Sequence, residues 1–132
     1  MSQENVEIVR RLYEQWVDGD FSNREPFAEE LDFEIEGAIV PDPVRTCGID
    51  GMAKAWREIL GAWDNWRTGP IEELIEVGDR IVVFSRIGGR GAQSGAVVDA
   101  PRAAVFTFRG GKIVRLFLAD RDKALEAVGL RE

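Results

Sequence analysis

The chain has 132 residues and a formal net charge of −7, with 24 acidic against 17 basic side chains. This excess of negative charge argues against nucleic acids and anionic membranes as the main partners. A chain of this length fits one domain with its own hydrophobic core, so we expect a single domain over residues 1–132. No apolar run approaches the roughly 20 residues that span a bilayer, and the polar, acidic N-terminus does not resemble a secretory signal. We therefore expect a cytoplasmic protein that does not bind membranes.

Histidine is absent, and Cys47 is the only cysteine. These two facts exclude an internal disulfide, Ser-His-Asp and Cys-His triads, and zinc sites built from histidine or from several thiolates. Acid–base chemistry is left to Asp, Glu, Tyr, Lys and Arg side chains. We expect neither a metal ion nor a cofactor.

The N-terminal part of the chain predicts two helices. Apolar residues recur at helical spacing over residues 6–16, which predicts a first helix that ends near Gly19. Ser22 is a candidate cap for a second, shorter helix, with Phe27 and Leu31 on its inner side. The next part predicts a strand and then a loop.

Residues 32–36 alternate apolar and acidic side chains, a pattern typical of a strand with one buried face. Residues 38–44 contain two prolines and predict a loop. Asp50 is the expected cap of a third helix, whose apolar stripe runs over residues 52–63.

The second half of the chain changes to the two-residue period of β-strands. Strands are predicted over residues 71–77, 81–87, 96–109 and 112–118, followed by a short helix over 121–128 that Asp120 would cap. Gly110-Gly111 supplies the turn of a tight hairpin, and the glycine-rich segment 88–95 joins two strands as a mobile or tightly turned piece. Helices followed by an antiparallel meander indicate an α+β domain. If the sheet curls, its concave side and the helices enclose a cavity, which is the expected binding site.

Several motifs in this order resemble one family. They are Ile8–Trp16 with Gly19-Asp20, Asp32–Gly37, Gly48–Gly51, Val77–Val83 and Phe106–Val114. Together they cover nearly the whole chain and resemble the SnoaL-like polyketide cyclase and ketosteroid isomerase group of the nuclear-transport-factor-2-like superfamily. The resemblance implies a cone-shaped α+β fold, with about three N-terminal and central helices packed on a curved, mainly antiparallel sheet and a short C-terminal helix.

The resemblance also implies positions for catalytic groups. The carboxylate base of the steroid isomerases falls on Glu36, at the end of the first strand. Their oxyanion hole would need a tyrosine where this chain has Leu12, one residue before Tyr13, and a carboxylic acid where it has Ala104. Without that hole we do not expect steroid isomerase activity. The histidine of the polyketide cyclases is missing, and the Asp-Arg-Asp set of the epoxide hydrolases has no match.

Glu36 and Arg86 are the candidate catalytic residues. Glu36 is either a solvated acid at a strand end or a pocket base whose pKa is raised by burial beside Trp56 or Trp63. Arg86 shares a strand face with Phe84, and if that face is concave, Arg86 needs a partner in the apolar cavity. We hypothesise that Glu36 and Arg86 both point into the cavity and pair there, either to bind a ligand oxygen or as a structural salt bridge.

The expected lining of the cavity combines residues from the helices with inward residues of the strands: Leu12, Tyr13, Trp16, Trp56, Ile59, Leu60, Trp63, Phe84, Ala104, Phe106, Leu116 and Leu118. The opposite strand phase, with Val105 and Phe117, would face a neighbouring copy. Because proteins of the resembled fold commonly dimerise through the outer sheet face, a homodimer is expected.

Three functions remain open from the sequence. The cavity binds a small, largely apolar molecule, as a cofactor-free isomerase, cyclase or hydrolase with Glu36 as the base. Alternatively the protein binds such a ligand without catalysis, or it is a dimeric interaction module whose cavity its own side chains fill. The cavity volume separates the last function from the others, and a pH–rate profile lost in Glu36→Gln separates the first from the second.

Overall fold

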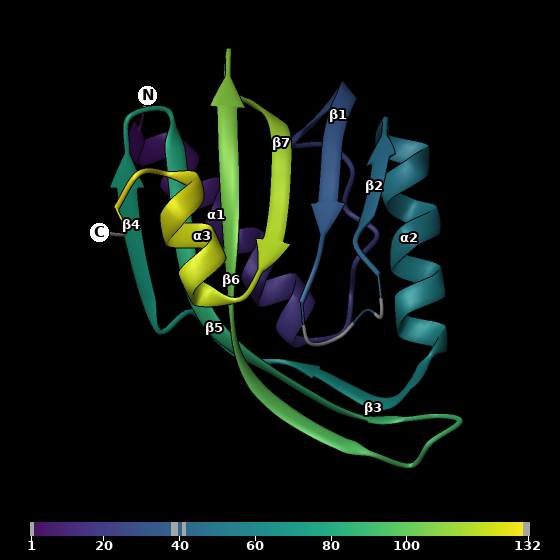
Figure 1. Cartoon of the computed structure of the whole chain (residues 1–132). Coiled ribbons are helices and arrows are strands. Elements are labelled where there is room, and N and C mark those ends of the chain that lie inside the picture. The colour runs from purple at the N-terminus through teal and green to yellow at the C-terminus, as the bar shows by residue number, and fades with distance from the viewer. Residues whose placement is uncertain (1, 38–39, 41, 131–132) are drawn as a thin grey trace.

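The computed structural model describes residues 2–37, 40 and 42–130. Within these ranges the elements follow one another as α1 (Ser2–Val17), β1 (Phe27–Ile35), β2 (Val44–Cys47), α2 (Ile49–Gly61), β3 (Trp63–Thr68), β4 (Glu73–Val77), β5 (Arg80–Gly91), β6 (Val97–Arg109), β7 (Lys112–Ala119) and α3 (Arg121–Ala127). The strands join into one strongly curled sheet (Figure 1), and the predicted α+β class is confirmed. No helix among the described residues combines the length and the apolar composition that crossing a bilayer requires.

The sheet is mainly antiparallel. Its strands lie in the order β2-β1-β7-β6-β5-β3, and β4 also pairs with β5. β1 and β7 form the parallel pair. The long strand β5 pairs with β4 through residues 80–84 and with β3 through residues 87–91. The part of β5 that carries β3 therefore extends away from the rest of the sheet, as Figure 1 shows.

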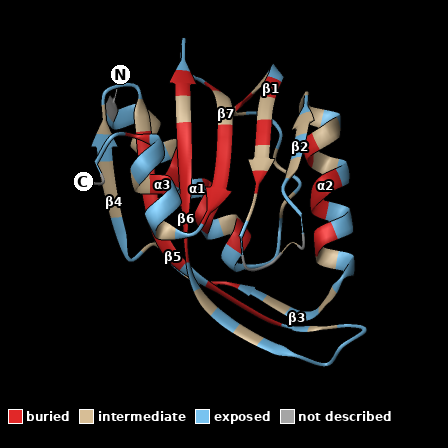
Figure 2. Ribbon diagram, viewed as in Figure 1, coloured by how far each residue is buried: buried red, intermediate tan, exposed pale blue. Residues whose placement is uncertain are grey.

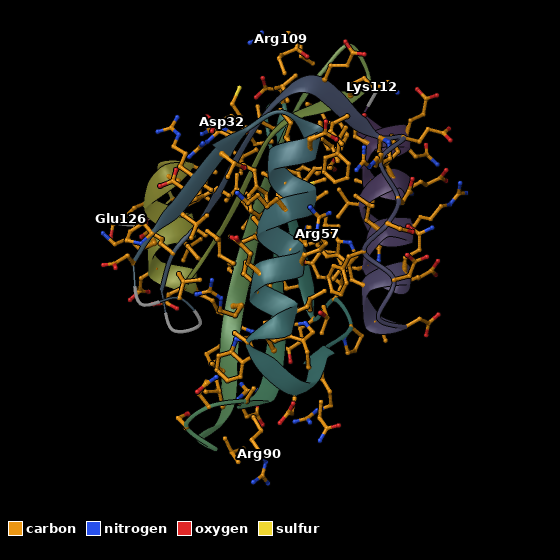
Figure 3. The ribbon with its side chains drawn as sticks, turned by 90° about the vertical axis from the view of Figure 1, so that its right-hand side faces the viewer. Asp32, Arg57, Arg90, Arg109, Lys112 and Glu126 are labelled. Atoms are coloured by element: carbon orange, nitrogen blue, oxygen red, sulfur yellow. The ribbon has the colours of Figure 1, made fainter. Side chains whose placement is uncertain are left out.

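Two hydrophobic clusters lie on opposite faces of the sheet. The larger one, between the sheet and helices α1 and α2, contains the fully buried Leu12, Phe33 and Phe106. The smaller one, between the sheet and α3, contains Val82 and Phe117. The buried residues follow the central strands in Figure 2, and Figure 3 shows α1 and α3 at opposite sides of the molecule. The central strands are thus covered on both faces.

The second predicted helix does not form. The backbone and hydroxyl of Ser22 donate hydrogen bonds to Asp20 Oδ1 at 2.9 and 2.6 Å, and no helical segment follows. Phe27 and Leu31 belong to β1, where both side chains join the larger cluster. A spacing of four residues returns to the same face of a strand as well as of a helix, so it did not discriminate between the two.

The third predicted helix is shorter than expected, and a strand was missed on each side of it. α2 ends at Gly61, so Trp63 and Trp66 lie in β3. Of the predicted loop, residues 38, 39 and 41 lie outside the described residues, whereas Val44 begins β2 and pairs with Ile35. The predicted strand boundaries in the second half of the chain agree with the structure to within a few residues.

The two aspartates predicted to cap helices bind arginine side chains instead. Asp50 lies in the first turn of α2 without capping it and accepts a hydrogen bond from Arg24 Nη1 at 3.0 Å. Asp120 precedes α3 without a side-chain cap bond and accepts one from Arg102 Nη1 at 2.9 Å. The second contact ties β6 to the end of β7 and helps to build the candidate site.

The glycine-rich segment is half strand and half turn. Residues 88–91 continue β5, and the turn covers residues 92–94. Gly88 pairs with Arg67 of β3, and a Cβ atom at this position would lie 2.7 Å from Arg67 Nη2. The hairpin at Gly110-Gly111 is confirmed, with φ angles of 60° and 79° that favour glycine.

Candidate functional site

A small cavity lies between the concave face of the sheet and helices α1 and α2. Its free volume is about 30 Å³, enough for one or two water molecules. Three helical residues and seven strand residues form its wall: Tyr13, Trp16, Ile35, Trp56, Trp66, Thr68, Ser85, Ile87, Arg102 and Leu118. The lining is mainly aromatic and aliphatic, with a few polar groups among the apolar ones.

The aromatic side chains pack against one another around this space. The ring centroids of Tyr13 and Trp16 are 5.0 Å apart, and those of Trp16 and Trp56 are 5.6 Å apart. Trp66, which is only partly buried, donates a hydrogen bond from its indole Nε1 to Thr68 Oγ1 at 3.1 Å. The indoles of α1 and α2 thus form the inner wall, and Trp66 of β3 forms an outer one.

Arg102 is the charged group of the cavity. Its side chain is 5% exposed, although it carries a guanidinium. Nη1 donates to Asp120 Oδ1 at 2.9 Å, and Nη2 donates to the backbone carbonyl of Glu36 at 2.7 Å. Burial lowers the pKa of Arg102, while the hydrogen bond and the charge of Asp120 oppose this shift. Because a guanidinium keeps its proton in proteins, the cavity wall holds a positive charge.

Tyr13 places a neutral hydroxyl beside this charge. Burial raises the pKa of Tyr13 strongly, against the weaker opposing effects of a hydrogen bond with Ser85 and the charge of Arg102. The phenol therefore stays protonated at any physiological pH. Tyr13, Ser85 and Arg102 come from α1, β5 and β6, and in the sheet register Ser85 lies directly opposite Arg102.

The titration of Tyr13 can be observed directly, because it is the only tyrosine of the chain. In the native protein we expect no tyrosinate absorbance near pH 10, where an exposed tyrosine ionises. The unfolded chain does ionise there, so stability should fall as the pH rises above about 10, and Tyr13→Phe should remove this loss. A tyrosinate signal with a midpoint near that of a free tyrosine would contradict the buried position of the hydroxyl.

Glu36 lies next to the cavity but does not line it. Its side chain is partly buried, and its backbone carbonyl accepts the hydrogen bond from Arg102. The cavity wall, as far as the structure describes it, contains no carboxylate. The catalytic role predicted for Glu36 stays a prediction.

Arg86 does not point into the cavity, and the predicted pair with Glu36 is wrong. Its Nε lies 3.1 Å from Asp99 Oδ1, and the two side chains are 47% and 65% exposed. Arg86 and Phe84 lie on the strand face that is turned away from the cavity, and Phe84 belongs to the smaller cluster. Both were predicted to share the concave face.

The predicted lining is right in part. Tyr13, Trp16, Trp56 and Leu118 line the cavity. Leu12, Ala104, Phe106 and Leu116 face the same side of the sheet, but they are buried in the core and do not reach the open space. The remaining predicted residues lie elsewhere, either in the smaller cluster or along grooves at the surface of α2: Phe84, Ile59, Leu60 and Trp63.

Two of the missed lining residues, Ser85 and Ile87, follow from an error of phase on β5. Val82, Val83 and Phe84 are all apolar because both faces of β5 are covered, so their sequence gave no alternation from which to choose a face. The sequence of β6, in contrast, contained a pattern that could have identified two of the missed residues. Ala104 was placed inward correctly, and a period of two then leads to Arg102 and, through the sheet register, to Ser85.

The outer face of the sheet offers less apolar surface than expected. Val105 and Phe117 are 4% and 7% exposed, because they pack with Ala124 and Val128 near α3. Their predicted contact with a second copy therefore loses its support, and the homodimer itself stays a prediction. The outer face also carries charged groups: Asp32 Oδ2 lies 2.8 Å from Arg45 Nη2 and 2.8 Å from Arg115 Nη1.

The described residues contain no group of three or more Cys, Asp or Glu side chains placed to hold a metal ion. The side chains of the cavity themselves offer hydrogen-bond donation from Arg102 and the hydroxyls in apolar surroundings.

Solved structures share this fold over nearly the whole chain. A SnoaL-like polyketide cyclase structure from Jannaschia sp. CCS1 is 18% identical, with a TM-score of 0.75, and the match covers 98% of this chain and 94% of that one. An NTF2-like protein of unknown function from Burkholderia pseudomallei K96243 is 20% identical, with a TM-score of 0.77 and coverage of 95% and 97%. TerC, co-crystallised with polyporic acid, is 18% identical, with a TM-score of 0.73 and coverage of 95% and 97%.

At these identities the likeness shows a common fold and no more. No curated protein sequence matches the chain significantly. The SnoaL-like domain family, in contrast, matches residues 9–116, which is most of the chain. The protein belongs to the SnoaL-like domain family.

Proposed function

We propose that the protein binds a small, largely apolar molecule in the cavity, with a polar end of the ligand directed at Arg102, Tyr13 and Ser85. The observation that carries the proposal is the position of these three polar side chains, each at most 5% exposed, in an otherwise aromatic and aliphatic cavity. Burying polar groups is costly unless they find partners, and a few convergent polar groups in an apolar cavity are typical of a ligand site. TerC, which shares the fold, was co-crystallised with polyporic acid, and this supports the proposal.

The cavity must open to admit such a ligand. Its free volume of about 30 Å³ is far below the roughly 300 Å³ or more of a typical ligand pocket. Trp66 is the wall that can move at the least cost, because it is partly buried and lies on β3 at the end of the strand order. With so little free volume, the unliganded cavity resembles the filled cavity expected of an interaction module. A ligand-binding protein differs from such a module in that its cavity opens to admit a ligand.

Removing this wall is expected to strengthen ligand binding. Trp66→Ala should bind toluene about tenfold more tightly than the wild-type protein, because the ligand no longer has to displace the indole. Isothermal titration calorimetry measures the affinity. Trp63→Ala is the matched control, since Trp63 is also a partly buried tryptophan of β3 but does not line the cavity.

Binding of toluene by neither the wild-type protein nor Trp66→Ala would contradict the proposed function. The ring centroids of Trp63 and Trp66 are 6.1 Å apart, so Trp63→Ala loosens the Trp66 indole without removing it, and we expect a much smaller gain. Equal gains in the two variants would contradict the role of Trp66 as the wall that opens. In the absence of any binding the interaction module would become the better account, and sedimentation of the protein over a range of concentrations would test whether it forms the expected homodimer.

We further propose that Glu36 acts as a base if the protein is an isomerase, cyclase or hydrolase. The support is the hydrogen bond from Arg102 to its backbone carbonyl, together with its negative charge, which counters the effect of burial on the pKa of Arg102. Glu36→Gln keeps the shape of the side chain and removes the base. An unchanged pH–rate profile in this variant, for any substrate that the protein turns over, would exclude the role.

A further inference from the structure

The polar groups of the cavity are all suited to donate hydrogen bonds. Of the described lining residues one is cationic, three carry hydroxyls and none carries a carboxylate. Thr68 Oγ1 already accepts from Trp66, so the hydrogen of its hydroxyl is left to donate. The phenol of Tyr13 is held in its protonated form, as burial raises its pKa. This set of donors fits a ligand that accepts hydrogen bonds.

In the ion pair at the cavity wall, the positive partner is buried and the negative partner is exposed. The Arg102 side chain is 5% exposed, whereas the side chain of its partner Asp120 is 54% exposed. Water therefore solvates the negative partner, and the positive partner faces the low-dielectric cavity. Charges interact more strongly in such surroundings than in water, so the field inside the cavity favours an anion.

The two described hydrogen bonds of the guanidinium leave it able to bind a further group. Nη1 donates a hydrogen bond to Asp120, and Nη2 donates one to the backbone carbonyl of Glu36. A guanidinium has five N–H groups in a planar fork, so other N–H groups are left to donate. This fork matches the two oxygens of a carboxylate.

We propose that the ligand of this cavity is a small organic acid, bound as its carboxylate by Arg102 with help from Tyr13 and Ser85. The inference rests on the proposed function and names the chemical class of its ligand. The apolar part of the acid would lie against Trp16 and Trp56, which form the inner wall. The net charge of −7 disfavours non-specific capture of an anion by the surface.

Benzoate and benzamide test the proposal, because they have nearly the same shape and differ in charge at pH 7. We expect the wild-type protein to bind benzoate at least about tenfold more tightly than benzamide, as measured by calorimetry, since hydrogen bonds to a charged group are the stronger ones. In Arg102→Met, which retains most of the volume of the side chain, this preference should fall to about onefold. Arg86→Met is the matched control: it removes an arginine that is also paired with an aspartate, on the neighbouring strand but outside the cavity, and should keep the preference.

A second variant separates ligand binding from a purely structural salt bridge. Asp120→Asn retains a side-chain oxygen that can accept from Arg102 but removes the competing negative charge. We expect it to bind benzoate several-fold more tightly than the wild-type protein while its affinity for benzamide stays unchanged. A structural role alone predicts lower stability with no gain in affinity. Thermal unfolding of each variant shows which ones are folded at the temperature of the titrations.

The possible outcomes distinguish this inference from the proposed function. If toluene and benzamide bind but benzoate binds no better than benzamide, the acid is excluded and the proposed function stands. If benzoate is preferred but the preference survives in Arg102→Met, the carboxylate lies elsewhere and the inference is overturned. If none of the three probes binds, the proposed function fails together with the inference.

Discussion

Replacing Phe106 by alanine is expected to lower the free energy of unfolding by about 3–5 kcal/mol. Phe106 is fully buried in β6, and its ring centroid lies 6.2 Å from that of Tyr13 and 6.1 Å from that of Trp16. The substitution removes buried apolar surface and leaves a void directly beneath two residues of the cavity wall. Urea denaturation followed by tryptophan fluorescence measures the change.

Val97→Ala is the control for Phe106→Ala. Val97 lies on the same strand but is 68% exposed, so its truncation should change the free energy of unfolding by less than about 0.5 kcal/mol. A loss of similar size in both variants, or a loss below about 1 kcal/mol in Phe106→Ala, would contradict the packing of this core.

Asp120→Ala is expected to destabilise the protein more than Arg102→Met, although Asp120 is the more exposed partner. Removing the carboxylate leaves a guanidinium that is 5% exposed without its ion pair, and we expect this to cost about 2–3 kcal/mol. Removing the guanidinium instead leaves Asp120 in water and keeps most of the side-chain volume at position 102. The unpaired carbonyl of Glu36 is then the main loss, about 1 kcal/mol. Chemical denaturation at neutral pH gives both values.

The pair between Arg86 and Asp99 provides the comparison on the other face of the sheet. Both side chains are substantially exposed, so Asp99→Ala should cost no more than about 0.5 kcal/mol. If Arg102→Met were as costly as Asp120→Ala, or more so, the burial of the guanidinium would not be what sets the energetics of the pair.

The strands of the C-terminal half were predictable because local signals agreed there. Gly110-Gly111 indicated the hairpin, and the strand phase that the family resemblance implied placed Ala104 and Phe106 inward, on the side of the larger cluster. The region around Phe27 was misread because its apolar spacing fits both a helix and a strand. β3 was missed because Trp63 continues the helical stripe of α2, while the chain in fact leaves the helix at Gly61.

The site was less predictable than the fold, for a physical reason. An interior position is visible in the sequence only where one face of an element is polar, and β5 is covered by the larger cluster on one face and by α3 on the other. Arg86 was therefore assigned to the cavity that Ser85 in fact lines. Arg102 was not singled out, although it stands two residues before Ala104 and therefore on the same face of β6.

The binding of a small molecule in the cavity is tested most directly by the indole N–H signals in a proton–nitrogen correlation spectrum. The chain has four tryptophans; Trp16, Trp56 and Trp66 line the cavity, whereas Trp63 does not. On addition of toluene, we expect progressive shifts of the three cavity indoles and a much smaller shift of the Trp63 signal. Shifts confined to Trp63, or no shift of any indole at saturating toluene, would contradict it.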